Sequence, residues 1–184
     1  MPRMPRALLA EQLARHVPPT ARPLAVLATA ADLRAVAAAF EEACLVSHGS
    51  STRRTARRGR IGRTLRGDAT RLPFADRALG AVVAICTLGR ADDPRAALGE
   101  LRRALRDGGQ LFVVERLADG GWAHLWRRLG GRSGTAVAAE ELTALLLNAD
   151  FTEIGQTTLG GSRPRLLTSA RLRVLPGEEL GAIR

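Results

Sequence analysis

Two hydrophobic periods divide the chain into predicted strands and predicted helices. Continuous apolar runs of three to ten residues, the pattern of strands that are buried on both faces of a sheet, predict strands at 24–27, 44–46, 79–88 and 111–114. Shorter or more polar runs predict three further strands, at 63–66, 151–158 and 166–174.

Apolar residues at helical spacing predict four helices, at 7–16, 30–43, 94–105 and 138–148. Pro94 fits the first turn of its helix, and Asp107-Gly108-Gly109 predicts a glycine cap at its end. Strands that alternate with helices favour a parallel sheet. The predicted fold class is α/β: a Rossmann-like, doubly wound, mostly parallel sheet with an antiparallel C-terminal strand pair.

The composition is that of a single globular domain. The 184 residues are 46% hydrophobic and 25% charged, so we expect one domain over residues 1–184. Cys44 and Cys86 lack metal-type spacing and the three histidines share no motif, so no metal site is predicted. The sequence has no apolar run of membrane-spanning length and no signal-peptide core, which predicts a cytoplasmic protein without a membrane span.

Positive charge is concentrated in one segment. The formal net charge is +10, of which +7 lies in residues 51–71, where eight arginines accompany one acid, Asp68. The chain has no lysine, which a GC-rich genome explains without any functional demand; the clustering is less easily explained this way. Residues 48–62 have no apolar period and predict an Arg-rich, poorly ordered loop. Phosphate binding is one use of such charge, although the segment has no aromatic residue for base stacking.

Four pieces of sequence follow one another within residues 67–115. They are Gly67-Asp68-Ala69 with Leu72-Pro73-Phe74, the apolar run at 79–88, the helix ending in Leu105-Arg106-Asp107-Gly108-Gly109, and a strand ending in Glu115. In this order they resemble the class I S-adenosylmethionine-dependent methyltransferases, in the small-molecule branch that includes quinone-biosynthesis enzymes. The resemblance implies that a ligand binds at the carboxyl ends of the strands.

The resemblance also implies which residues hold S-adenosylmethionine. Asp68 would accept a hydrogen bond from the adenine amino group, and the backbone N–H of Ala69 would donate to an adenine ring nitrogen. The alternative is that Asp68 is a turn residue or a partner of nearby arginines. Thr29 and the last residues of the predicted fourth strand, Cys86, Thr87 and Leu88, would line the rest of the cofactor.

On the substrate side, Trp122 and Trp126 are four residues apart. They would either form a lid over the methyl acceptor or simply pack against each other. Glu115 is either a base or an ion-pair partner of Arg116 or Arg90, so no catalytic residue is assigned.

Several positions depart from the family's pattern. Residues 24–32 contain no glycine, although the family has a G-x-G-x-G loop there that lets the backbone approach the cofactor. Ser47 and His48 stand where the family places an acid that holds both ribose hydroxyls, and Gly80 stands where it often has an aspartate.

Two functions are therefore in competition. In the first, the protein transfers a methyl group to a small molecule through an atypical cofactor site. In the second, it is a non-catalytic methyltransferase-fold protein. It would act as a binding or regulatory partner through residues 51–71, which would engage an acidic protein or nucleic acid.

Overall fold

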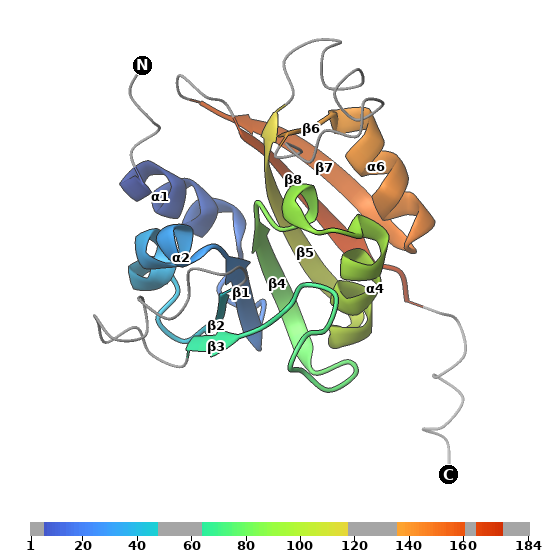
Figure 1. The fold of residues 1–184 in the computed structure, drawn as a ribbon, viewed down its shortest axis with the longest axis horizontal. Helices are drawn as coiled ribbons and strands as arrows, with labels where there is room; N and C mark the ends of the chain where they lie inside the picture. The colour runs from blue at the N-terminus through green and yellow to red at the C-terminus, as the bar shows by residue number, and fades with distance from the viewer. Residues whose placement is uncertain (1–5, 48–63, 118–135, 161–164, 175–184) are drawn as a thin grey trace.

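The computed structural model describes residues 6–47, 64–117, 136–160 and 165–174, and a mostly parallel sheet forms their centre (Figure 1). The strand order is β3-β2-β1-β4-β5-β8-β7, and β6 pairs with β5. The strands are β1 (Leu24–Ala28), β2 (Cys44–Ser47), β3 (Thr64–Arg66), β4 (Leu79–Ile85), β5 (Leu105–Leu117), β6 (Ala136–Val137), β7 (Phe151–Leu159) and β8 (Arg165–Leu172). Because β8 runs antiparallel to both β5 and β7, the predicted fold class is confirmed.

Helices cover both faces of this sheet (Figure 1). They are α1 (Arg6–His16), α2 (Ala30–Val36), α4 (Pro94–Ala104) and α6 (Ala139–Asn148), with short 3-10 turns η1 (Ala37–Ala39) and η2 (Leu88–Arg90). Alternate residues of β1 point to opposite faces: Leu27 packs in one cluster with Leu101 of α4, and Val26 in another with Leu13 of α1. The apolar strands predicted from sequence therefore lie between two hydrophobic cores, one on each face of the sheet.

The helix predicted at 30–43 is shorter than expected. It ends at Val36 and continues only as the 3-10 turn η1, after which Phe40 leaves helical geometry with φ −134°. The side chain of Phe40 packs into the core on the α1 and α2 face, and Ala43 N–H donates to the Phe40 carbonyl. This turn lets the chain reverse direction before β2.

The glycine cap predicted after 94–105 is wrong. Helix α4 ends at Ala104, and the fully buried Leu105 is already extended and begins β5. Gly108, with φ +69°, lies instead in the first part of that strand. Burial of Leu105 opposite Leu79 of β4 thus ends the helix before the glycines are reached.

Two predictions fall on residues that the structure does not describe: the Arg-rich loop at 48–62, and the tryptophans Trp122 and Trp126. In the described ranges, no helix has the length and apolar character needed to cross a membrane. The same ranges contain no group of three or more His, Cys, Asp or Glu side chains placed to hold a metal ion.

Candidate functional site

The carboxyl ends of β1, β2 and β4 meet at one edge of the sheet. Ala28 at the end of β1 is paired with Ser47 at the end of β2, and Leu27 is paired with Ala84 of β4. The strand order reverses direction at β1, so β1 and β4 flank a topological switch point, where doubly wound sheets bind their ligands. This edge therefore brings Thr29 together with the residues that follow β4.

Thr29 is the N-cap of α2. Its Oγ1 accepts a hydrogen bond from Asp32 N–H at 3.3 Å and donates to Asp32 Oδ2 at 2.8 Å. No residue from Ala28 to Asp32 has a positive φ, so this loop accommodates threonine and alanine without backbone strain. The backbone of this loop therefore requires no glycine between Ala28 and Asp32.

The turn after β4 has an unusual backbone. Cys86 lies in the left-handed region with φ +49° and donates its N–H to the Val114 carbonyl at 2.7 Å. Thr87 is buried and turns its hydroxyl toward the Leu27 carbonyl of β1, with an Oγ1–O distance of 3.4 Å. The strand predicted at 79–88 therefore ends at Ile85, because Cys86 redirects the chain over the end of β1.

Glu115, on β5, forms hydrogen bonds with the backbone of this turn. Its Oε1 accepts hydrogen bonds from Leu88 N–H at 2.8 Å and Gly89 N–H at 3.2 Å. Burial raises the pKa of Glu115 to about 7, although these N–H groups and the positive charge of Arg165 act in the opposite direction. In the described structure Oε2 of the same carboxylate is buried without a hydrogen-bond partner.

Arg165, at the start of β8, connects two parts of this edge. Its Nη2 lies 3.7 Å from Asp32 Oδ1, and its Nη1 lies 3.8 Å from the Cys86 sulfur. Burial, followed by the charge of Glu115, raises the pKa of the Cys86 thiol to about 11, so the thiol is neutral at neutral pH. Sequence reasoning missed Arg165, because only the long-range pairing of β8 with β5 places it here.

Asp68 forms a tight turn after β3. Its Oδ1 accepts from both the N–H and the hydroxyl of Thr70 at 2.9 Å, and its carbonyl accepts from Arg71 N–H. Ala69 is buried in the same hydrophobic cluster as Leu88. The structure thus shows the hydrogen bonds of a turn residue at Asp68, which is one of its predicted roles, and the adenine contact stays a prediction.

Ser47, the last residue of β2, has a buried side-chain hydroxyl. Its Oγ is buried and has no hydrogen-bond partner in the described structure, while its carbonyl accepts from Gly67 N–H at 3.2 Å. A Cβ on Gly67 would lie 2.8 Å from Val46 Cγ1, so glycine is needed for this close approach of the two chains. His48 lies outside the described residues.

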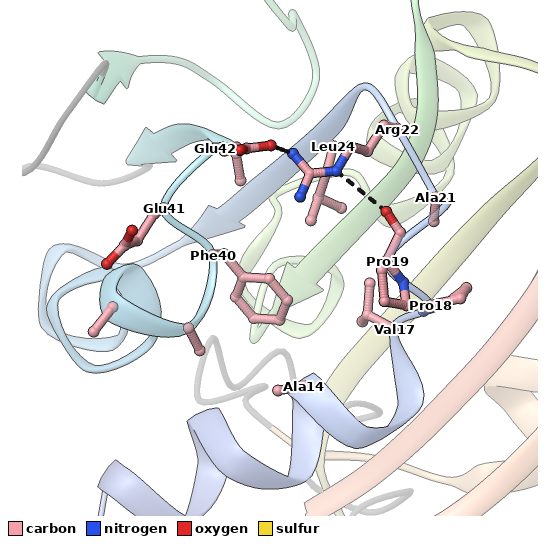
Figure 2. A pocket seen from close by; sticks show the side chains of 13 residues that line it. Ala14, Val17, Pro18, Pro19, Ala21, Arg22, Leu24, Phe40, Glu41 and Glu42 are labelled. Carbon is pink, nitrogen blue, oxygen red and sulfur yellow. Dashed lines mark hydrogen bonds and ion pairs between the residues drawn. The ribbon is translucent and has the colours of Figure 1, made fainter.

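A cavity of about 360 Å³ lies elsewhere, at the amino ends of β1 and β2 (Figure 2). Arg22 lines it, donating Nε to the Pro19 carbonyl at 3.2 Å and forming an ion pair with Glu42. Apolar walls come from Val17 and Phe40. None of the predicted cofactor residues lines this cavity, so it is distinct from the carboxyl edge.

Comparisons with known proteins find methyltransferases. A family model described as a methyltransferase domain matches residues 20–113, just over half of the chain. Demethylmenaquinone methyltransferase of Mycolicibacterium paratuberculosis is 51% identical over 49 residues, which are 27% of this chain and 21% of that protein. Human thiol S-methyltransferase TMT1B is 40% identical over 58 residues, 30% of this chain and 24% of that protein.

These matches span about a quarter or less of the curated relatives. A solved structure from Thermotoga maritima, a SAM-dependent methyltransferase, superposes with a TM-score of 0.69 at 21% identity. The superposition covers 90% of this chain and 89% of the other.

Proposed function

Because this chain belongs to the methyltransferase domain family, we propose that it transfers a methyl group from S-adenosylmethionine to a small molecule. The observation that carries the proposal is the switch point between β1 and β4. The family match runs from before β1 into β5 and so includes the strands whose carboxyl ends meet there. Doubly wound sheets bind nucleotide-like ligands at this position.

The polar atoms at this edge fit part of the cofactor. Ser47 Oγ is buried without a partner in the described structure, and this hydroxyl would bind one ribose hydroxyl. Asp68 and the Ala69 N–H would bind the adenine ring, while Thr29, Cys86, Thr87 and Leu88 would line the remainder. When bound, S-adenosylmethionine supplies an electrophilic methyl group on a sulfonium.

The proposed cofactor site is atypical in two respects. The loop after β1 is closed by the Thr29–Asp32 hydrogen bonds rather than opened by glycines, and Asp32 is engaged by Arg165. At the end of β2 a single hydroxyl replaces a carboxylate, which would have accepted from two ribose hydroxyls at once. We therefore expect weaker cofactor binding than a glycine-rich loop and an acid would give.

The acceptor class is proposed from the curated relatives. Their names specify demethylmenaquinone and thiols as acceptors, and both are small molecules. Methyl transfer depends mainly on bringing the acceptor atom and the methyl group together in line, so a site that excludes water and orients both reactants suffices.

Isothermal titration of the wild-type chain with S-adenosylmethionine and with its demethylated product tests the proposal. We expect saturable binding of both, weakened in Asp68→Ala but not in Asp76→Ala, which removes an exposed acid of the neighbouring loop that pairs with Arg103. Transfer of a labelled methyl group to thiol and quinol acceptors then tests activity. No binding up to millimolar cofactor would reject the proposal and favour a non-catalytic binding protein.

A further inference from the structure

Glu115 is the only acidic residue that is fully buried in the described part of the chain. Burying a carboxylate is costly unless hydrogen bonds and opposite charge compensate for the lost water. One oxygen of Glu115 is compensated by the N–H groups of Leu88 and Gly89, but the other has no partner among described residues. A leucine would pack here without the free-energy cost of desolvating a carboxylate. The presence of glutamate therefore indicates a functional role.

Glu115 binds the backbone of the turn that follows β4. Cys86 has a left-handed backbone, and the next residues form η2, whose first N–H groups have no acceptor within the turn itself. Oε1 provides that acceptor, so the path of the backbone from Thr87 to Gly89 depends on this carboxylate. Under the proposed function, the same turn lines the cofactor.

We propose that Glu115 is a positioning residue of the cofactor site, whose ionised carboxylate fixes the turn after β4 in the shape that receives S-adenosylmethionine. The inference rests on the proposed function and adds a specific prediction to it. Ionised acceptors form stronger hydrogen bonds than neutral ones, so the turn is held most firmly when Glu115 is charged. A sulfonium cation bound nearby would favour the same charged form.

Charged and titratable groups on neighbouring elements shift the equilibrium between the neutral and the ionised form of Glu115. Arg165 of β8 favours the ionised form of Glu115, and the neutral thiol of Cys86 lies within range of the Glu115 charge. Asp32 of α2 pairs with Arg165 and so offsets part of its effect, while Arg116 acts on Cys86 from β5. Burial outweighs these groups and brings the pKa of Glu115 to about 7, so binding that favours the ionised form becomes tighter as pH rises through neutrality.

The test is titration of S-adenosylmethionine into wild type, Glu115→Gln and Asp93→Asn at about pH 6 and about pH 8. Asp93 is the matched control, because its exposed carboxylate also accepts two backbone N–H bonds, from Arg95 and Ala96. At the higher pH we expect Glu115→Gln to bind roughly five- to tenfold more weakly than wild type, and at the lower pH the gap to close. Asp93→Asn should follow wild type. Titration of the ligand's own amino group is common to all three proteins and cancels in the comparison.

Equal affinity of wild type and Glu115→Gln at both pH values would overturn the inference. If Glu115→Gln does not fold, infrared spectroscopy of the wild type near pH 6 decides instead. Adding S-adenosylmethionine should diminish the C=O band of a buried protonated carboxyl, and an unchanged band in the presence of saturating ligand would overturn the inference. A wild type that binds no S-adenosylmethionine at either pH would reject the proposed function itself, which distinguishes the two failures.

Discussion

The guanidinium of Arg165 lies 3.7 Å from the carboxylate of Asp32, joining the start of β8 to the first turn of α2. Both side chains are about one-fifth exposed, at 21% and 17%. The pair therefore ties β8 to the start of α2, directly after the loop that follows β1.

Replacing Arg165 by Met should lower the free energy of unfolding by about 1–3 kcal/mol, because Asp32 would keep a largely buried charge without its partner. Urea-induced unfolding measures this. The control is Arg171→Met, which breaks a shorter ion pair of 2.9 Å with Glu153 whose side chains are 44% and 66% exposed. Solvent screening should limit that loss to about 0.5 kcal/mol, even though the atoms are closer. Equal losses in the two variants would show that burial does not decide the strength of the Arg165 pair.

The pH dependence of stability should report the environment of Glu115. Its pKa is about 7 in the folded protein against an ordinary value of 4.5, so the folded state holds the proton more tightly than the unfolded state. The contribution of the neutral carboxyl is complete below about pH 4.5 and is lost as pH rises through 7. Glu115→Gln stays neutral, so its stability relative to wild type should increase across this window by an amount of the order of 3 kcal/mol.

A second glutamate offers a control of opposite sign. Hydrogen bonds from Arg103 lower the pKa of Glu100, so its contribution is present above its ordinary pKa and is lost as pH falls below that value. Glu100→Gln should therefore change its stability relative to wild type only in acid, with wild type losing its advantage there. Chemical unfolding of the three proteins over a pH series measures both effects, and a flat difference for Glu115→Gln from acid to neutral pH would contradict the assigned environment.

Thr29→Ala should destabilise the fold by about 1 kcal/mol, because α2 would lose the side-chain acceptor for the Asp32 N–H. Thr29→Ser keeps the hydroxyl and should remain within a few tenths of a kcal/mol of wild type. Thermal unfolding distinguishes the two. If both variants lose stability equally, the methyl group rather than the cap stabilises this turn.

The sequence predicts those elements whose burial is evident from a continuous local run of apolar residues. All seven residues of β4 are buried, and a continuous apolar run is the signal for such a strand. The end of α2 and the start of β5 escape prediction, because they depend on Phe40 and Leu105 reaching a core assembled from distant segments.

In the candidate site, too, residues in local motifs can be predicted from sequence, whereas residues placed by long-range contacts cannot. Asp68 is predicted because it lies within an ordered local motif; the structure shows its turn hydrogen bonds to Thr70, and its contact with adenine stays a prediction. The role of Glu115 follows from the packing of β5 beside the turn after β4, and that of Arg165 from the pairing of β8 with β5, about fifty residues away, and no local pattern specifies either. For Glu115 the sequence leaves open a base or an ion pair with Arg116 or Arg90, whereas the structure shows a carboxylate that binds backbone N–H groups.

Gly80 lies where the backbone before β1 approaches β4 closely. The residue donates its N–H to the Pro23 carbonyl at 2.8 Å, and a Cβ at this position would lie 2.2 Å from the Arg22 carbonyl oxygen. Backbone atoms must move to relieve such a contact, so an aspartate has no room here.

Gly80→Ala should therefore lower the free energy of unfolding by at least about 2 kcal/mol, as expected for overpacking against backbone. Gly99→Ala is the matched control, since Gly99 lies exposed within α4 and an added Cβ would meet nothing within 4 Å. Removing the flexibility of a helical glycine should raise stability by about 0.5–1 kcal/mol. The same chemical change is thus expected to have opposite signs at the two positions, which urea unfolding resolves directly. Stabilisation at both would mean that the β1 entry segment moves away from β4 easily, and that the contact between Gly80 and Arg22 does not fix the register of these strands.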